Sequence, residues 1–360
     1  MTAEMPDEIT IEQLKLSDKN KEIAFLQRAY DDNPRMSDEA FWDWHYQQAP
    51  YKEPDKLPIW VAKAGEQIVG QVGTIPVEVN VDGVRQKAIW ILDMIVAPEF
   101  RRRGLAKKLV NAAHDICPFG LVINTEAQVG STKLLQDAGY KIIVNVPRFH
   151  KPLFPANDIR EIAKFKVLRK TVNLAYGPFR PRFKKNERVR VVENFDESFE
   201  TFWAEAETQW PCAVRRDVKY LEWQFTRQPG KQFDVIGYYD GEKLLGYAVL
   251  FFRKTGVNGA IPKAAVSDIC YHPNNPKQII DALLEEALRI AVERQAGGLV
   301  TDALDTLVEE RLAHFGFWRV KNPLQFMVKS DARQDILYNP KKWFLTRGDS
   351  DISIFENPNL

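Results

Sequence analysis

Residues 101–106 combine three consecutive arginines with a glycine and a small residue, and they follow closely on an apolar run that ends at Pro98. The apolar run predicts a buried strand, and the apolar spacing in 105–113 predicts a helix that begins just after Gly104. The start of a helix leaves backbone N–H groups without partners, and the helix dipole favours negative charge there. Glycine lets a ligand approach the backbone, and the arginines add positive charge. The chemistry that this pattern predicts is binding of a pyrophosphate.

The order of these residues resembles a motif of the GNAT acyltransferase superfamily. Residues 101–106 fit the pattern Q/R-x-x-G-x-G/A, and residues 96–99 stand where that family has V-x-P-E/D. In GNAT proteins this loop holds the pyrophosphate of acetyl-coenzyme A, so the resemblance implies acetyl-CoA or another acyl-CoA as cofactor. The alternative is an ordinary strand–helix turn whose arginines meet only water. The cofactor-binding residues that the resemblance implies are Met94, Ile95, Val96, Arg101, Arg102, Arg103, Gly104, Leu105 and Ala106.

Acetyl transfer from a thioester to an amine needs a base for the amine proton and donors for the thioester oxyanion. Two carboxylates are candidates for the catalytic base. Asp93 lies on the strand before the loop, and Glu126 follows the apolar run 121–125. Asp93 has an alternative interpretation, a structural hydrogen bond to a neighbouring turn or to a domain interface. GNAT proteins often carry a tyrosine as general acid where this chain has Leu135, so the resemblance supplies no acid for the leaving thiolate.

Two halves of the chain repeat the same order of features. Each half has an aromatic cluster, then a hairpin with a Gly-containing turn, then an Asp on an apolar strand, and finally a Gly-aromatic step. The offset is 179 residues between Trp44 and Trp223 and 175 residues between Asp93 and Asp268. This repeat predicts an α/β fold with a mixed sheet, built from two tandem GNAT-like acyl-CoA N-acyltransferase domains.

The predicted domains are an N-terminal GNAT domain in 1–150, a basic Pro-containing linker in 151–187 and a degenerate GNAT-like domain in 188–360. We expect the N-terminal domain alone to bind CoA, because the second copy has Asn275-Pro276 where the first has its glycine loop. The linker contains an amphipathic stretch from Ile159 to Leu174. Its lysines and arginines either face solvent, which is the simpler interpretation, or bind an acidic partner.

Composition excludes several other classes of protein. The 360 residues carry 50 Lys+Arg against 49 Asp+Glu, which gives little support for a nucleic-acid-binding role. No apolar run approaches the roughly 20 residues of a membrane span, and the first residues lack the features of a signal peptide. Three scattered cysteines and five scattered histidines indicate free thiols and no metal site. We expect a cytoplasmic protein without a nucleic-acid partner, a membrane span or a metal.

The whole chain resembles a group of tandem GNAT proteins often met beside bacterial exopolysaccharide-assembly genes. The segments that carry this likeness are 93–104, Tyr220-Leu221-Glu222-Trp223 and the terminal W-x-L-T-x-G-D-S-D of 343–351. The resemblance implies an N-acetyltransferase that moves an acyl group from acetyl-CoA to a primary amine of a small molecule, with an amino sugar of polysaccharide biosynthesis as the first guess. The alternative is a non-catalytic CoA-binding or scaffold protein. A set of aromatic residues in the two halves either stacks on a sugar ring or lines a cleft, or, as is more usual, packs a core: Trp42, Trp44, Tyr46, Trp90, Trp203, Trp210 and Trp223.

Overall fold

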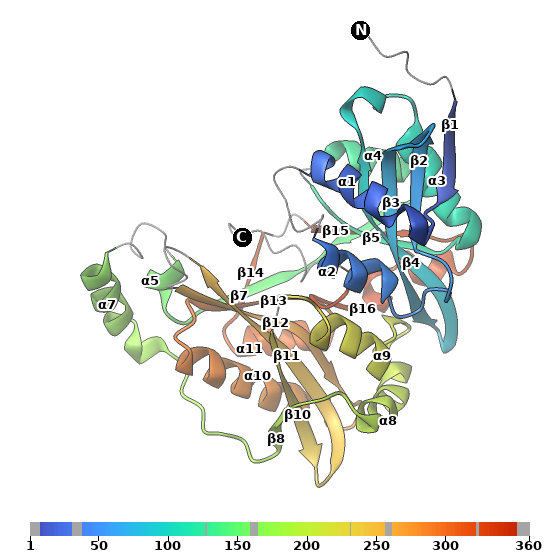
Figure 1. Ribbon diagram of the computed structural model, residues 1–360. Coiled ribbons are helices and arrows are strands. Elements are labelled where there is room, and N and C mark those ends of the chain that lie inside the picture. Colours follow the sequence, from blue (N-terminus) through green and yellow to red (C-terminus); the bar gives the residue numbers. More distant parts are fainter. Residues whose placement is uncertain are drawn as a thin grey trace. The chain divides into compact units, whose positions relative to one another are not determined.

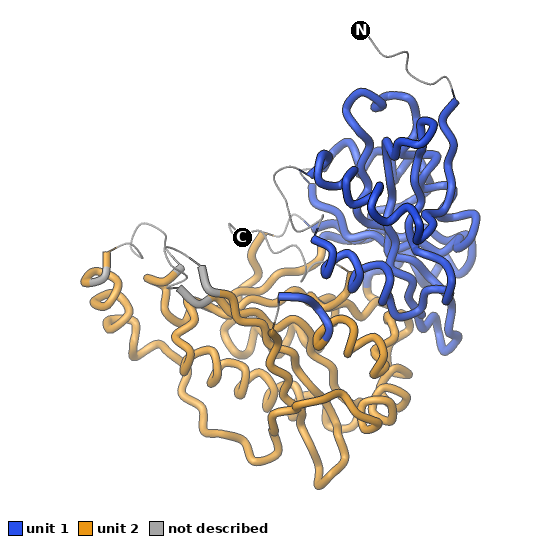
Figure 2. The backbone as a smooth tube through the Cα atoms, in the orientation of Figure 1, with its two compact units in different colours: residues 1–145, 227–230, 323–340 blue, residues 146–226, 231–322, 341–360 orange. Residues whose placement is uncertain are grey.

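The computed structural model has a mixed α/β architecture (Figure 1) and describes residues 8–30, 38–126, 128–158, 165–230, 232–255, 261–321 and 324–350. The chain forms two compact units, coloured separately in Figure 2. Unit 1 comprises 1–145, 227–230 and 323–340, and unit 2 comprises 146–226, 231–322 and 341–360. Among the described residues, every helix falls short of the length and apolarity needed to span a membrane.

Unit 1 is built on one sheet, in which only the β4–β5 pair is parallel among the described strands. In spatial order the strands are β1 (Ile9–Gln13), β2 (Ile59–Ala64), β3 (Gln67–Val81), β4 (Val84–Val96), β5 (Gly120–Thr125), β15 (Leu324–Lys329) and β6 (Lys141–Asn145). Its helical segments are η1 (Leu16–Asp18), α1 (Lys19–Ala29), α2 (Glu39–Trp42), the π-helical η3 (Asp43–Gln47), η4 (Pro98–Phe100), α3 (Leu105–Ile116), α4 (Val129–Asp137) and α12 (Gln334–Leu337).

Helices cover both faces of the unit 1 sheet. Gly70 on β3 faces Leu109 of α3, whereas Gly73 on the same strand faces Tyr46 of η3. An odd separation along a strand places two residues on opposite faces, so α3 and η3 lie on opposite faces of the sheet. The core under α3 joins apolar residues of this helix to those of β2–β5. This packing fixes the start of α3 at the carboxyl end of β4.

Unit 2 has a second sheet of similar topology, again with one parallel pair, β12–β13, in the main order of its described strands. In spatial order its strands are β8 (Val189–Val192), β10 (Phe233–Asp240), β11 (Lys243–Thr255), β12 (Ile261–Tyr271), β13 (Gly298–Leu304), β7 (Arg148–Pro152) and β14 (Trp318–Val320), while β16 (Trp343–Thr346) pairs with β13 and with β9 (Cys212–Val214). Its helical segments are α5 (Pro155–Asp158), α7 (Lys166–Ala175), η5 (Gly177–Phe179), α8 (Glu197–Ala206), η6 (Glu207–Gln209), α9 (Val218–Leu221), the π-helical η7 (Glu222–Thr226), α10 (Pro276–Glu293), α11 (Thr306–His314) and η9 (Pro340–Lys342).

The two halves of the chain exchange one strand each, and this exchange departs from the predicted domain bounds. Strand β15 comes from the C-terminal half, yet it lies between β5 and β6 in unit 1. Strand β7 comes from the N-terminal half and lies between β13 and β14 in unit 2. The first unit boundary therefore falls at 145/146, before β7, and residues 323–340 do not stay with the predicted C-terminal domain. The physical reason is that each of these strands forms its backbone hydrogen bonds with strands that are distant in sequence.

The predicted linker also has more structure than expected. It holds the end of β7, both α5 and α7, and the short η5. The predicted amphipathic stretch 159–174 becomes α7 from Lys166 onward, and its first part, 159–164, lies outside the described residues.

Candidate active site

The turn between β4 and α3 has the geometry of an anion-binding site. Gly104 is the residue before α3 and has φ 73°, while Arg102 also has a positive φ of 65°. Left-handed residues within such a turn point successive N–H groups into one concavity. The first main-chain bond of the helix runs from Lys108 N to Gly104 O at 3.1 Å, which leaves the amides of 105–107 without an acceptor in their own helix. A Cβ built on Gly104 meets no described atom within 4 Å, so the space over the turn is open.

The three arginines of this turn differ in what they contact. Arg101 donates from Nε to the carbonyl of Val96 at 2.9 Å and so ties the turn to the end of β4. The Arg103 guanidinium lies over the Phe100 ring, 5.2 Å from its centroid. All three arginine side chains are exposed, whereas Phe100 is buried. Arg101 thus shapes the loop as well as adding positive charge to it.

Strands β4 and β5 pair over only a short stretch. Their parallel register joins Ile89 to Gly120 and Trp90 to Leu121. Beyond these pairs β4 continues to Val96 and β5 to Thr125. The predicted pantetheine-binding residues 94–96 therefore lie on the part of β4 that no longer pairs with β5, and the turn at 101–106 follows directly.

A β-bulge places Asp93 at the start of this stretch. Gln71 pairs with Ile95 and Gly73 with Leu92, so Asp93 and Met94 together oppose the single residue Val72. Asp93 adopts φ 49°, a left-handed conformation that costs energy for a residue other than glycine. Bulges that re-aim side chains are common next to active sites.

The carboxylate of Asp93 is held by two side chains of η3. Tyr46 donates from its hydroxyl to Asp93 Oδ2 at 2.7 Å, and His45 Nε2 lies 3.0 Å from the same oxygen. Both η3 side chains are buried, and the side chain of Asp93 is only 5% exposed. Burial and the nearby carboxylates of Asp93 and Glu22 raise the pKa of Tyr46 well above its usual value, so its phenol remains a donor. These contacts fit the structural alternative for Asp93, with the partner on a neighbouring helix.

Gly73 makes room for this arrangement. A Cβ at Gly73 would lie 2.8 Å from Tyr46 Cε1 and 2.9 Å from its hydroxyl. We expect Gly73→Ala to push Tyr46 away from Asp93 and to destabilise the protein by about 1–3 kcal/mol, as overpacking does. Urea unfolding measures the change. Gly130→Ala is the matched control, since a Cβ there meets no described atom within 4 Å; equal stability of the two variants would contradict this role for Gly73.

Glu22 is a further buried acid behind the bulge. Its side chain is 0% exposed, and Oε2 accepts from Trp42 Nε1 at 2.5 Å, while Oε1 has no partner among the described residues. Burial, and secondarily the charge of Asp93, raises the pKa of Glu22 to about 8. Gln71 of β3 also belongs to the cluster, because its Nε2 donates to the backbone carbonyl of Asp93 at 3.3 Å. No signal in the sequence distinguished Glu22, His45 or Gln71 as members of this cluster, because each lies in an element that only the folded sheet brings to Asp93.

The raised pKa of Glu22 makes stability depend on pH. The folded state favours protonated Glu22, so its contribution is complete below the unfolded pKa and is lost as pH rises through about 8. We therefore compare the free energy of unfolding of Glu22→Gln with that of the unsubstituted protein at each pH. We expect this difference to shift in favour of the variant by roughly 1–3 kcal/mol from pH 5 to pH 8. Urea unfolding at the two pH values tests this, and a difference that stays constant with pH would contradict it.

Glu126 lies elsewhere, just past the carboxyl end of β5, and is partly exposed. Asn145 Nδ2 donates to its Oε1 at 2.6 Å. The side-chain contacts of the two carboxylates differ, since Asp93 is held by His45 and Tyr46 of η3 and Glu126 contacts Asn145 of β6. Leu135 is 2% exposed and belongs to the apolar core.

The tryptophans considered as sugar-stacking residues are core residues with exposures of 0–5%: Trp42, Trp44, Trp90, Trp203, Trp210 and Trp223.

Unit 2 differs from unit 1 at the corresponding place, the start of α10 and the end of β13. Its helix α10 begins after Asn275, which has φ 59°, with Pro276 at the first turn. Strand β16 pairs with Ala303 and Leu304 of β13, beyond the residues of β13 that pair with β12. Arg216 holds this strand by donating to Thr346 Oγ1 at 3.2 Å. It also donates to Asp349 Oδ2, just after the strand, at 2.6 Å and to Asp268 Oδ2 on β12 at 3.1 Å. In unit 2 the chain itself thus lies next to the part of β13 that follows the parallel pairing.

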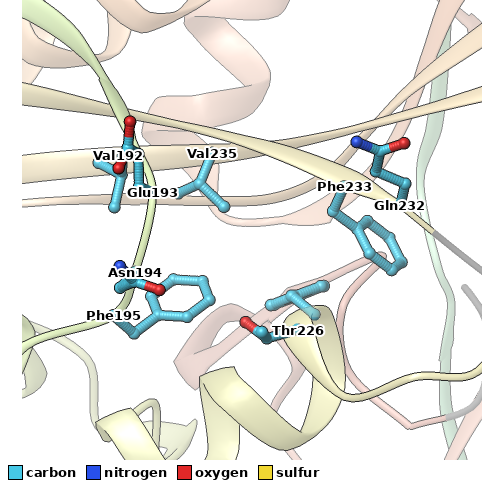
Figure 3. Close-up of a pocket in the computed structure, with 9 residues that line it drawn as sticks. Val192, Glu193, Asn194, Phe195, Thr226, Gln232, Phe233 and Val235 are labelled. Carbon is cyan, nitrogen blue, oxygen red and sulfur yellow. The ribbon is translucent and has the colours of Figure 1, made fainter.

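Unit 2 also contains a small surface pocket of about 180 Å³ (Figure 3). Its walls include the rings of Phe195, Phe225 and Phe233, with Glu193 and Gln232 among its polar side chains. The volume is below the roughly 300 Å³ of ordinary ligand pockets, and none of the predicted site residues lines it. Among the described residues, no group of three or more metal-binding side chains is placed to hold an ion.

Comparison with known proteins gives one family match and two curated relatives over part of the chain. Residues 10–120 match the family model described as an acetyltransferase (GNAT) domain. N-acetyltransferase 8B of Rattus norvegicus and N-acetyltransferase 8 of Homo sapiens are each 33% identical to this chain over 87 residues, or 23% of the chain. The match spans 38% and 37% of the length of these curated relatives.

Solved structures with the same fold cover most of the chain. A GCN5-related N-acetyltransferase from Anabaena variabilis ATCC 29413 has a TM-score of 0.62 at 12% identity, covering 89% of this chain and 72% of its own. A probable N-acyltransferase from Enterococcus faecalis V583 has a TM-score of 0.58 at 15% identity, with the same coverages. N-myristoyltransferase of Saccharomyces cerevisiae, solved with myristoyl-CoA bound, has a TM-score of 0.56 at 12% identity, covering 91% and 85%. Residues 10–120 thus match a GNAT acetyltransferase domain model, and the solved structures named here share the fold of the chain.

Proposed function

We propose that the protein transfers an acyl group from acetyl-CoA to a primary amine of a small molecule, and that unit 1 carries the reaction. The observation that supports this most is the turn at 101–106, with its left-handed Gly104, its open space and the first-turn amides of α3 that lack an acceptor within the helix. A pyrophosphate there would receive several N–H bonds and the favourable end of the helix dipole. The pantetheine arm would then follow residues 94–96, where β4 no longer pairs with β5.

The reaction needs no covalent enzyme intermediate. The amine nitrogen attacks the thioester carbon, so that a C–N bond forms and the C–S bond breaks. One proton passes from the amine nitrogen to a base, and the CoA thiolate takes up a proton. Because buried Leu135 cannot donate one, solvent supplies it in this proposal. Backbone N–H groups of β4 near the bulge would stabilise the oxyanion.

Glu126 and Asp93 have different roles in this proposal, the first as the base and the second as a positioning residue. Glu126 is partly exposed at the carboxyl end of β5, on the same edge of the parallel pair as the turn after β4, and would accept the proton. Asp93 is enclosed by His45 and Tyr46, and would act as a positioning residue that holds the bulge. Both carboxylates named from the sequence therefore have a place, in different roles.

We expect Glu126→Gln to lower kcat by about 10²- to 10⁴-fold with little change in KM for acetyl-CoA, as loss of a general base does. Asp93→Asn keeps an acceptor for Tyr46 and should retain more activity than Asp93→Ala, with its loss divided between kcat and KM. Steady-state kinetics at several pH values measures both. An unchanged kcat and pH profile in the Glu126→Gln enzyme would show that Glu126 is not the base.

Unit 2 would have a different role from unit 1. We propose that the two units descend from one GNAT-like domain and that a chain binds one CoA, in unit 1. Support comes from the repeated order of strands, from Asn275-Pro276 in place of the glycine loop, and from β16 alongside β13. We also propose a cytoplasmic location, in line with Cys117, Cys212 and Cys270, which are free thiols.

The direct test incubates purified protein with acetyl-CoA and a panel of primary amines, amino sugars first, and follows the release of free thiol. Turnover with a member of the panel supports the proposal and identifies the acceptor class. Tight CoA binding without turnover on any amine would favour a non-catalytic CoA-binding role. This second function is favoured by Leu135, which stands where the family often has a tyrosine and cannot act as a general acid.

A further inference from the structure

Helix α7 turns its apolar side to solvent. The exposed fractions are 80% for Val167, 48% for Leu168 and 75% for Leu174. Val167 and Leu174 are two turns apart and so lie on the same side of the helix, while Leu168 lies about 100° further round, at the edge of the same stripe. The apolar stripe of an amphipathic helix ordinarily faces a core. In the part of the chain that the structure describes, this stripe has no such cover.

The polar side of α7 attaches the helix to unit 2, beside α5 (Figure 1). Asn173 donates from Nδ2 to Asn157 Oδ1 at 3.0 Å, and its Oδ1 accepts from the backbone N of Ala156 at 3.1 Å. Arg180, just after the helix, donates to the carbonyl of Leu153 at 2.9 Å. Because these contacts fix which side faces the protein, the exposure of the apolar side is a property of how α7 docks.

The same segment carries a concentrated positive charge. Residues 165–185 contain seven lysines and arginines and neither aspartate nor glutamate, whereas the whole chain has a net charge of only +1. The rest of the chain therefore carries a net negative charge. Lys170, Arg182, Lys184 and Lys185 are exposed, and no salt bridge between described residues includes any of them. Two further exposed rings, Phe165 at 64% and Phe179 at 74%, flank the helix.

We propose that α7 and the segment 176–185 bind an anionic lipid surface. Exposed aliphatic and phenylalanine side chains would enter the boundary between headgroups and acyl chains, while the lysines and arginines would lie at the lipid phosphates. At ten residues, α7 lies on the surface in this proposal and does not cross it.

The chemistry of the segment favours lipid over other acidic partners. A nucleic acid would be held by the cations but would leave the branched aliphatic side chains of Val167 and Leu174 in water. Paired copies of this chain could cover the aliphatic side chains, but they would bring two sets of cations together. Only an anionic interface satisfies both halves of the observation, the apolar stripe and the charge.

The test measures co-sedimentation of the full chain with vesicles of phosphatidylcholine alone and of phosphatidylcholine with about 30 mol% phosphatidylglycerol. We expect binding to the anionic vesicles that weakens with salt. Replacing Lys170, Lys184 and Lys185 by glutamine should lower the partition coefficient roughly a hundredfold, from about 1 kcal/mol for each cation. Val167→Glu with Leu174→Glu should abolish binding.

Two matched controls distinguish a site from a general property of the surface. Val191 is 73% exposed on β8 and Lys277 is exposed on α10, so Val191→Glu and Lys277→Gln should leave lipid binding unchanged. All variants should keep the thermal unfolding midpoint of the unsubstituted chain. Equal binding to both vesicle types, or to neither, would overturn the proposal. A dimer in sedimentation velocity that dissociates in the variant with Val167→Glu and Leu174→Glu would also overturn the proposal. The same holds if the chain binds tRNA but no vesicles, and the glutamine variant loses the tRNA binding.

Discussion

Gly104→Asp is expected to weaken CoA binding by about a hundredfold or more. The substitution places a carboxylate where the proposed pyrophosphate contacts the amides of α3, and like charges in contact repel strongly at a partly shielded surface. The fold should tolerate the change, because a Cβ at this position meets no described atom within 4 Å and aspartate adopts left-handed backbone more readily than most residues. Titration calorimetry with CoA measures the effect.

Gly65→Asp is the matched control for this variant. Gly65 lies in the hairpin turn between β2 and β3 of the same unit, has φ 60° and also has open space around its Cβ position. The two variants therefore impose similar backbone strain and the same change of charge. If Gly65→Asp reduced CoA affinity as much as Gly104→Asp, the loss would reflect strain or net charge, and the assignment of the turn would fail.

A fragment that ends at the predicted domain boundary, residues 1–187, is expected not to fold. It lacks β15, which pairs with β5 on one side and β6 on the other, so two strand edges would be exposed. It also loses Phe326, Met327 and Val328, all 0% exposed. Unpaired edges next to uncovered apolar surface promote aggregation. Solubility on expression and circular dichroism after refolding give the readout.

A rearranged chain provides the positive control for the strand exchange. Residues 8–145 joined through a flexible Gly/Ser linker to 323–340 contain every described strand of the unit 1 sheet. We expect this chain to be soluble, to unfold cooperatively and to bind CoA. A soluble, cooperatively folded fragment 1–187 would show that β15 is dispensable and would contradict the predicted need for the exchange.

Local signals in the sequence predicted much of unit 1. The alternation in β2 and β3 around Gly65, the apolar run of β4 and the spacing of Leu105, Leu109 and Val110 each depend on neighbours within a few residues. The position of Gly104 before a helix follows from the same local pattern, and the structure gives it the left-handed φ that only glycine adopts without strain.

Features that depend on distant parts of the chain escaped prediction. Strand β7 follows the first Gly-aromatic step and β15 follows the second, so the order of elements in the sequence does not tell which unit each strand joins. The cluster around Asp93 assembles from α1, η3 and β3, and its formation depends on a bulge that shifts the strand register. Aromatic residues at 42–46 signal burial, but burial alone does not reveal that His45 and Tyr46 face a carboxylate.

The central claim is that one CoA binds each chain, with its pyrophosphate on the backbone amides at and after Gly104 in the turn 102–106 of unit 1. A crystal structure grown with excess acetyl-CoA tests it most directly. The account predicts density for the diphosphate over Gly104 and for the pantetheine arm along residues 94–96. Density at the start of α10 in unit 2, or a turn at 102–106 left empty beside saturating cofactor, would contradict it.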